Sequence, residues 1–289
     1  MELSSLETLP DLAGEYPLSA EQIAEFGRDG HIGLRAVAST DEVAAYRTRI
    51  RDAVARYNTQ TGSLDEPDQS GARAFIQVEN LWERDDDVRR FVFASRFAKI
   101  AADLMGVDRV RLLYDQALFK QSGGKPTDWH QDGVFFPALD PVKIVSMWMP
   151  LVPVRRSLSF MSGIHTRGDL QAPYGIDERT EEFFNQFLAE TGARVRHYGA
   201  MAPGDVTFHD CWTPHRAVAH ASEEPTTREV MTMIYFADGA HVVDPRAAGL
   251  REAEAIEDEM ATFGWQAGDL AEGPVAPLLY ERPLESPQS

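Results

Sequence analysis

The sequence is poor in cysteine, in positive charge and in long apolar runs. Cys211 is the single cysteine of 289 residues, which excludes a disulfide within the chain and fits a reducing compartment. The 28 lysines and arginines face 46 aspartates and glutamates, and the net charge of −18 weighs against nucleic acid and anionic membranes as partners. The most apolar run, Ile144 to Val154, is too short to span a bilayer. Met1 to Pro17 lacks the basic start and apolar centre of a signal peptide, so we expect a cytoplasmic protein.

The composition is that of a folded protein with a sizeable core, because 43% of the residues are hydrophobic. The first part of the chain, residues 18–106, has apolar residues at helical spacing. Helices are expected over 18–29, 40–58 and 87–105, with Ser19 capping the first and Gly106 closing the last. A short strand is expected over 30–34 and a polar surface loop over 61–73.

Beyond Gly106 the pattern changes to short β-rich segments separated by glycine and proline. The expected strands are 110–120, 129–132, 143–151, 158–161, 194–197, 206–209, 216–220 and 228–236. Eight strands at this spacing favour a sandwich or jelly roll over residues 107–240, with one helix over 176–190 at its rim. Residues 241–289 form a C-terminal extension with an acidic helix. No linker or repeat interrupts the sequence, so we expect a single domain, 1–289, that is mainly β with flanking helices.

His130 and Asp132 are the first candidates for chemistry. They follow an expected strand, and in extended backbone residues i and i+2 point to the same side, so both side chains can reach one metal ion. A third ligand is expected downstream, where His209, His215 and His220 are available. Two histidines and one carboxylate form the facial triad of non-haem Fe(II) oxygenases. The alternative is a surface histidine beside a solvated carboxylate.

Arg228 is the second candidate, because it begins a long apolar strand. A guanidinium buried there needs an anionic partner, and a carboxylate can bind it through two hydrogen bonds. The alternative is a solvated charge at the end of the strand.

Taken together, these residues resemble the phytanoyl-CoA dioxygenase-like branch of the Fe(II)/2-oxoglutarate oxygenases, which includes bacterial enzymes of secondary metabolism. The likeness extends from about Asp115 to Phe236. Besides the residues above, it includes Leu118-Phe119-Lys120, Trp129 to Asp132, Trp148, Leu158-Ser159-Phe160, Gly163-Ile164-His165 and the Gly204-Asp205 turn before Phe208-His209. The resemblance implies a double-stranded β-helix, which is a cupin-like jelly roll, and the cofactor Fe(II) with 2-oxoglutarate and O2 as cosubstrates.

The resemblance also implies roles for individual residues. His130, Asp132 and a distal histidine bind iron, Arg228 binds the far carboxylate of 2-oxoglutarate, and Gln116, Trp148 and Gln131 lie at the cosubstrate pocket. Family members place the arginine roughly a dozen residues after the distal histidine. His215 precedes Arg228 by 13 residues, His220 by 8 and His209 by 19, which selects His215 and leaves His209 as a core histidine.

Two differences from the family pattern bear on function. The serine that often follows the distal histidine by two residues is Ala217 here, so Arg228 needs another hydroxyl, either Thr207 or Thr232. Asp132 is present where halogenating relatives have a small residue, which disfavours halogenation.

The expected function is oxidation of a C–H bond in a small molecule, by hydroxylation, oxidative cyclisation or desaturation. A natural-product intermediate is the favoured substrate, with Phe75, Gln77, Phe135 and Tyr174 as its expected wall. The alternatives are a metal-dependent hydrolase or isomerase on the same barrel, which needs no 2-oxoglutarate, and a degenerate barrel that only binds. The sequence leaves the substrate's identity and the oligomeric state open.

Overall fold

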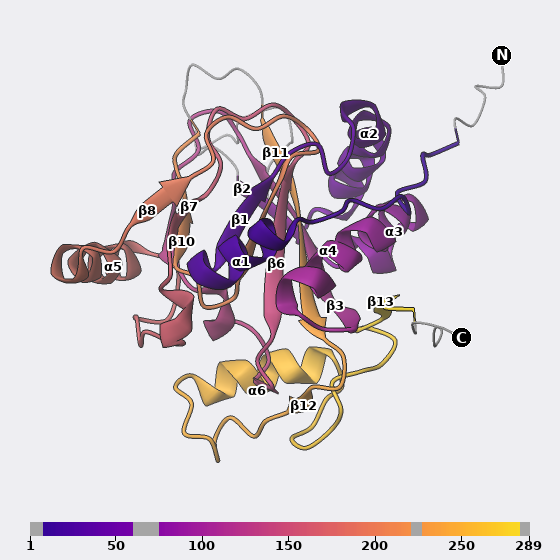
Figure 1. Cartoon of the computed structure of the whole chain (residues 1–289). Coiled ribbons are helices and arrows are strands. Elements are labelled where there is room, and N and C mark those ends of the chain that lie inside the picture. Colours follow the sequence, from indigo (N-terminus) through magenta and orange to yellow (C-terminus); the bar gives the residue numbers. More distant parts are fainter. Residues whose placement is uncertain (1–7, 60–74, 221–226, 284–289) are drawn as a thin grey trace.

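The protein consists of two facing antiparallel sheets with helices outside them, as Figure 1 shows for this computed structural model. The structure describes residues 8–59, 75–220 and 227–283. The major sheet has the order β1 (His31–Leu34), β9 (Val206–Asp210), β6 (Ile144–Pro150), β11 (Arg228–Ala237), β3 (Arg109–Lys120) and β13 (Leu278–Glu281), and β2 (Phe75–Glu79) also pairs with β3. The minor sheet has the order β4 (Thr127–His130), β10 (His215–Ala217), β7 (Ser159–Met161) and β8 (Val195–His197). This arrangement confirms the predicted jelly roll.

The two faces of the major sheet differ in what covers them. Every residue of β6 and β11 is buried, as expected for central strands covered on both sides. Alternate residues of β11, such as Met231 and Tyr235, belong to the large core beneath the N-terminal helices, together with Ile50 and Phe97. The other alternate residues face the minor sheet, where they line a cavity.

Four helices of the N-terminal part lie outside the major sheet: α1 (Ala20–Asp29), α2 (Thr40–Tyr57), α3 (Asp86–Val92) and α4 (Ser95–Met105). Ser19 caps α1 as predicted. The single helix predicted over 87–105 is wrong, because the chain breaks at Phe93 and Ala94. The break places Phe93 against Trp82, with 5.2 Å between ring centroids, and brings Phe91 edge-on to Phe97 at 5.5 Å. Core packing therefore overrides helical continuity. The loop predicted over 61–73 lies outside the described residues.

Two further helices flank the barrel. The helix predicted at the rim is α5 (Glu178–Thr191), which packs against β4. The predicted acidic helix is α6 (Ala253–Thr262) in the C-terminal extension, next to the short pair β5 (Leu139–Asp140) and β12 (His241–Val242). The sequence pattern did not predict β2, β5, β12 or β13. None of the helices in the described ranges combines the length and the apolar character that crossing a membrane requires.

Candidate active site

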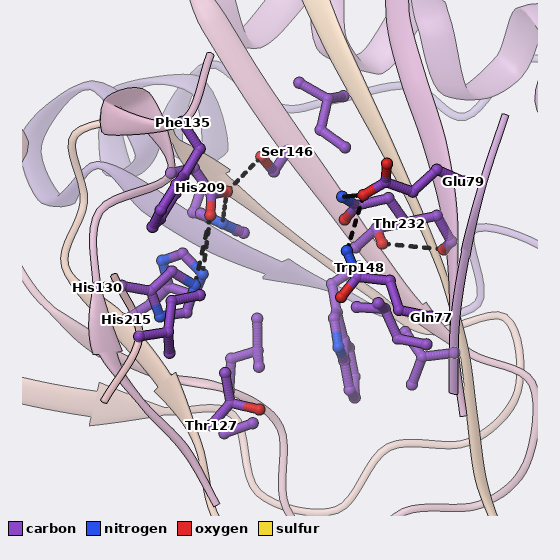
Figure 2. A pocket seen from close by; sticks show the side chains of 18 of the residues that line it. Gln77, Glu79, Thr127, His130, Phe135, Ser146, Trp148, His209, His215 and Thr232 are labelled. Atoms are coloured by element: carbon purple, nitrogen blue, oxygen red, sulfur yellow. Dashed lines mark hydrogen bonds and ion pairs between the residues drawn. The ribbon is translucent and has the colours of Figure 1, made fainter. Parts of the chain in front are cut away.

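A cavity of about 320 Å³ lies between the two sheets. Its floor is formed by side chains that alternate along strands of the major sheet, so that every second residue points into it. The minor sheet closes the opposite side with four residues, and Figure 2 shows how the two groups face each other across the space. From the major sheet these residues are Phe75, Gln77 and Glu79 of β2, Tyr114, Gln116 and Leu118 of β3, Ser146 and Trp148 of β6, His209 of β9, and Arg228, Val230, Thr232 and Ile234 of β11; from the minor sheet they are Thr127, His130, His215 and Ala217.

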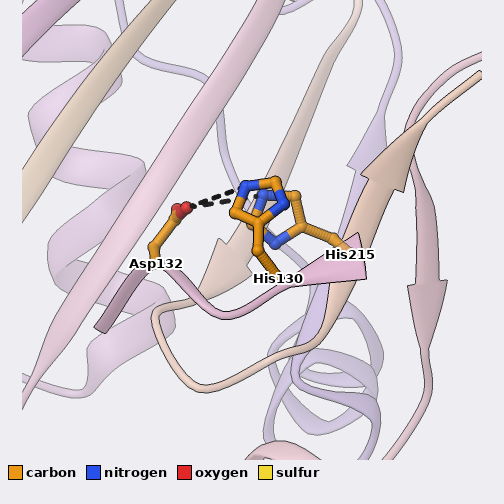
Figure 3. Close-up of side chains that lie close together, drawn as sticks. All are labelled: His130, Asp132 and His215. Carbon is orange, nitrogen blue, oxygen red and sulfur yellow. Dashed lines mark ion pairs between the residues drawn. The ribbon is translucent and has the colours of Figure 1, made fainter. Parts of the chain in front are cut away.

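His130, Asp132 and His215 come together at one end of this cavity (Figure 3). One potential ligand atom of each lies within 4.8 Å of the others. His130 and His215 are direct partners in the β4–β10 register, and each Nε2 lies 3.5 Å from Asp132 Oδ1. Asp132 stands just beyond β4, at the start of a short 3-10 turn, and the extended Gln131 keeps it on the histidine side. The predicted triad thus has the geometry of a metal site.

Hydrogen bonds outside the triad orient each of its members. His130 Nδ1 lies 2.8 Å from the carbonyl oxygen of Asp128, and His215 Nδ1 lies 3.1 Å from that of Thr213. A carbonyl oxygen only accepts, so in both rings Nδ1 carries the hydrogen and the lone pair of Nε2 is directed at the site. Such bonds on the far side of the ring are typical of histidines that bind metals.

Asp132 is also oriented by hydrogen bonds from outside the triad, and these reach its Oδ2 atom. Ser146 Oγ donates to Asp132 Oδ2 at 2.7 Å, and His209 Nε2 lies 3.1 Å from the same atom. Oδ1 is thereby left to face the two histidines. His209, predicted to be a core histidine, therefore contacts a member of the triad, while His220 does not line the cavity. The sequence did not predict a role for Ser146, because its contact with Asp132 depends on β6 packing beside the turn that follows β4.

The electrostatics of the triad favour the protonation states that metal ligands need. Burial lowers the pKa of His215 well below its ordinary value, and the neighbouring His130 lowers it further. Burial alone would raise the pKa of Asp132, but His215, His130 and His209 outweigh it and hold that pKa well below its ordinary value. A neutral His215 beside an ionised Asp132 supplies donor atoms of the kind that suits Fe(II).

The opposite end of the cavity floor is positively charged. Arg228 begins β11, lies directly across from Lys120 of β3, and donates to the carbonyl oxygen of Val218 at 3.3 Å. Lys120 Nζ donates to Thr127 Oγ1 at 2.9 Å and to the carbonyl oxygen of Lys125 at 2.7 Å. Burial lowers the pKa of Lys120 to about 7, and the charge of Arg228 acts in the same direction.

Thr127 was not predicted, although it lies across from Ala217 in the β4–β10 pair. The register shifts between His215 and Ala217, so β4 has one extra residue there. Simple alternation would put Thr127 and His130 on opposite sides, and the bulge puts both on the cavity. Of the two hydroxyls expected to replace the family serine, that of Thr232 lines the cavity and donates to the carbonyl oxygen of Gln116 at 3.1 Å. Thr207 is not among the cavity-lining residues.

Two of the residues implied for the cosubstrate pocket differ from expectation. Gln131 is outside the cavity, because its amide nitrogen donates to the carbonyl oxygens of Gly168 and Trp212 and its amide oxygen accepts from Leu170. We therefore do not retain Gln131 as a cosubstrate residue. Gln116 does line the cavity, but its amide nitrogen donates to Glu79 Oε1 at 3.0 Å. Trp148 lines the cavity beside Thr232, its partner in the β6–β11 register.

Three of the four predicted substrate residues, Phe75, Gln77 and Phe135, line the cavity. Tyr174 does not. It lines a second cavity of about 330 Å³ under the C-terminal extension, and its ring lies 5.2 Å from that of Phe135, between the two spaces. The prediction missed Glu79 and Glu259, which also line the first cavity.

Comparison with known proteins agrees with this geometry. The phytanoyl-CoA dioxygenase (PhyH) family profile matches residues 26–229, which is more than half of the chain. No curated protein sequence matches the chain.

Solved structures share the fold at 21–24% identity. The non-haem α-ketoglutarate-dependent carbocyclase SnoK from nogalamycin biosynthesis has a TM-score of 0.69 at 21% identity, with 92% of this chain and 99% of that chain covered. The epimerase SnoN from the same biosynthesis has a TM-score of 0.68 at 24% identity, with 90% and 98% covered. EctD from S. alaskensis has a TM-score of 0.58 at 21% identity, with 82% and 84% covered.

The family match, the jelly roll and the histidine–aspartate–histidine triad agree with one another. The chain belongs to the phytanoyl-CoA dioxygenase family and is an Fe(II)- and 2-oxoglutarate-dependent enzyme.

Proposed function

We propose that this enzyme oxidises a C–H bond of a small natural-product intermediate, by hydroxylation, oxidative ring closure or desaturation. One observation carries the proposal: the triad opens into a cavity between the sheets whose other end holds Arg228. Most of the wall between these ends is apolar, which suits a compact organic substrate. Two of the solved structures with this fold come from nogalamycin biosynthesis, which supports the choice of substrate class.

In this proposal His130, Asp132 and His215 hold the iron through Nε2, Oδ1 and Nε2. When bound, Fe(II) and 2-oxoglutarate supply an O2-dependent oxidation in which 2-oxoglutarate is decarboxylated to succinate. The protein's own contribution is to place three donor atoms that would hold the metal on one side of the site, facing the cavity. Ser146 and His209 keep Asp132 Oδ2 engaged, so that Oδ1 alone faces the histidines.

The cosubstrate is expected to lie with its far carboxylate at Arg228. The guanidinium there presents a planar pair of donors, which matches a carboxylate. Thr127 takes the role of the missing serine, because its oxygen accepts from Lys120 and its own hydrogen remains available to an anion. Trp148 forms the apolar side of the same pocket. Gln116 is assigned to the Glu79 side instead, since its amide nitrogen is directed there.

The substrate is placed between the triad, which has Phe135 beside it, and the outer wall that includes Phe75 and Gln77. An acyl-CoA is disfavoured, because this wall presents the carboxylates of Glu79 and Glu259 rather than cations for the phosphates of coenzyme A.

The test is succinate formation by anaerobically purified protein given Fe(II), 2-oxoglutarate and O2. We expect slow succinate formation without substrate and faster formation when a true substrate is present. Arg228→Gln should raise the KM for 2-oxoglutarate about tenfold to hundredfold, because a charge-assisted bidentate pair is lost. Arg216→Gln is the matched control, since Arg216 lies over the Trp129 ring and pairs with Glu181 on α5.

The rival functions predict different results. A hydrolase, an isomerase or a binding protein on this barrel would release no succinate, and Arg228→Gln would not change its behaviour toward 2-oxoglutarate. Either result would overturn the proposal.

A further inference from the structure

Three polar side chains that the proposed chemistry does not use meet at the outer wall of the cavity. Glu79 ends β2, Tyr114 lies in the middle of β3, and Glu259 lies on α6 of the C-terminal extension. All three line the same cavity as the triad. They come from distant parts of the sequence, so a shared position on one wall is a property of the folded protein alone.

The two carboxylates have no cation beside them within the described ranges. Glu79 Oε1 accepts from Gln77 Nε2 at 2.8 Å and from Gln116 Nε2 at 3.0 Å (Figure 2), and Arg84 reaches Glu79 only through the main-chain carbonyl oxygen. Glu259 is half-buried, and its carboxylate makes neither a hydrogen bond nor an ion pair with any described residue. Burial raises the pKa of Glu259, and repulsion by Glu79 raises it further, so a cation between them would stabilise both charges.

Tyr114 provides an independent sign of a missing ligand. Its side chain is only 7% exposed, yet its hydroxyl has no hydrogen-bond partner among the described residues. The Tyr114 hydroxyl is not enclosed by protein atoms, as that of Tyr235 is, but opens onto the cavity, where a ligand can supply the partner that a buried tyrosine usually has. The Tyr114 ring packs against Phe136 and Phe263, at 5.7 and 6.0 Å between centroids, and these contacts hold it at the cavity wall.

We propose that Glu79, Glu259 and Tyr114 form a binding site for a protonated amine of the substrate. An ammonium group has three N–H donors, which match two carboxylates and one hydroxyl oxygen. This inference rests on the proposed function, because it concerns the substrate of the same cavity. The substrate class is a small molecule with an apolar body and one basic nitrogen.

The spacing of the strands sets the distance between the oxidised carbon and the amine, and therefore the size of the apolar part of the substrate. β6 carries Ser146 beside Asp132, and β11 separates β6 from β3. At the usual strand spacing, β3 is about 10 Å and β2 about 14 Å from β6. The carbon that is oxidised near the triad is therefore separated from the amine by the width of one or two rings, and Phe135 and Ile234 supply apolar contacts in between.

The test measures binding of three compounds that share one skeleton: phenylbutylamine, phenylbutanol and phenylbutanoate. Calorimetry is done on protein loaded with Mn(II) and 2-oxoglutarate, which prevents turnover. The amine should bind about tenfold more tightly than the alcohol, because a charge-assisted contact adds to the same apolar burial. The carboxylate should bind more weakly than the alcohol. Glu79→Gln and Glu259→Gln together should abolish the preference for the amine, and Tyr114→Phe should reduce it.

Glu254→Gln is the control, because Glu254 is an exposed residue on the same helix that does not line the cavity. Equal binding of amine and alcohol by the natural protein, or a preference that survives the double substitution, would overturn the inference. Succinate formation by the natural protein distinguishes the two proposals. Without succinate, a persistent amine preference leaves the site in place and overturns the oxygenase function. With succinate but no preference, only the amine site is lost.

Discussion

At one end of the cavity each member of the triad is held by a second hydrogen bond, whereas at the outer wall Glu259 has no partner among the described residues. His130 and His215 stand on paired strands inside the barrel, where the register sets their separation, and Asp132 follows β4 directly. The outer wall combines β2, at the edge of the major sheet, with α6. The family profile ends at residue 229, before α6 begins. Of the outer wall, α6 therefore lies beyond the family profile, whereas β2 lies within it.

Asp132→Ala should have the largest effect, because it changes the triad at the metal end of the cavity. Loss of the only carboxylate in the triad should reduce Fe(II) affinity by more than about a hundredfold and remove succinate formation, since even outer contacts of a metal site cost about tenfold to hundredfold. Metal content after dialysis and succinate release measure the two effects. Asp128→Ala is the control, because that carboxylate does not line the cavity. Full iron loading of Asp132→Ala would refute the assignment of the triad.

Trp265→Ala tests whether the outer wall is a separate unit. Trp265 stacks on Phe263 at 4.3 Å, contacts Phe236 at 6.0 Å and donates to the carbonyl oxygen of Glu272 at 2.8 Å. Its loss should lower the free energy of unfolding by about 3 kcal/mol, because a large buried ring leaves a cavity. Denaturant melts measure this effect.

The matched control for Trp265→Ala is Trp82→Ala, a similarly buried tryptophan beneath the N-terminal helices. Both variants should lose comparable stability, while only Trp265→Ala weakens binding of phenylbutylamine. An equal loss of amine binding in both would show that the outer wall is not an independent unit.

Ser146→Ala tests how far the metal end depends on outer contacts. Ser146 Oγ is one of two donors to Asp132 Oδ2, so its removal should weaken Fe(II) binding about tenfold, the lower end of the range for such contacts. Ser159→Ala is the control, because Ser159 is a buried serine of β7 whose side chain forms no hydrogen bond with the residues that the structure describes. Iron titration of both variants gives the comparison, and identical affinities would mean that His209 suffices.

Lys120 should give the cosubstrate end a modest pH dependence. Its pKa is lowered to about 7, so it gains a proton as pH falls through that value and adds positive charge beside Arg228. The affinity for 2-oxoglutarate should therefore be highest below neutral pH and fall about threefold as pH rises through 7. Asp128 is the acidic group that opposes the shift in the pKa of Lys120.

Lys120→Met should remove this pH dependence. Calorimetric titration of 2-oxoglutarate from about pH 6 to about pH 9, with Mn(II) saturating, compares the two proteins. The same slope in both would assign the pH dependence to another group.

Much of the fold could be predicted because its signals are local. Ser19 caps a helix through its own side chain, and β6 and β11 are marked by long, mostly apolar runs. The break at Phe93 was missed because it depends on packing against Trp82, which lies outside the helix. β13 was missed because a short strand at a sheet edge exists only through its pairing with β3.

The sequence by itself determined the class of chemistry, since the order and spacing of His130, Asp132, His215 and Arg228 are written along the chain. Only the tertiary structure decided which groups surround them. Thr127 reaches the cavity because of a bulge in β4, Ser146 reaches Asp132 across two segments, and Glu79 and Glu259 line one cavity although they lie far apart in the sequence. Contacts of this kind depend on long-range packing, which no local pattern of residues records.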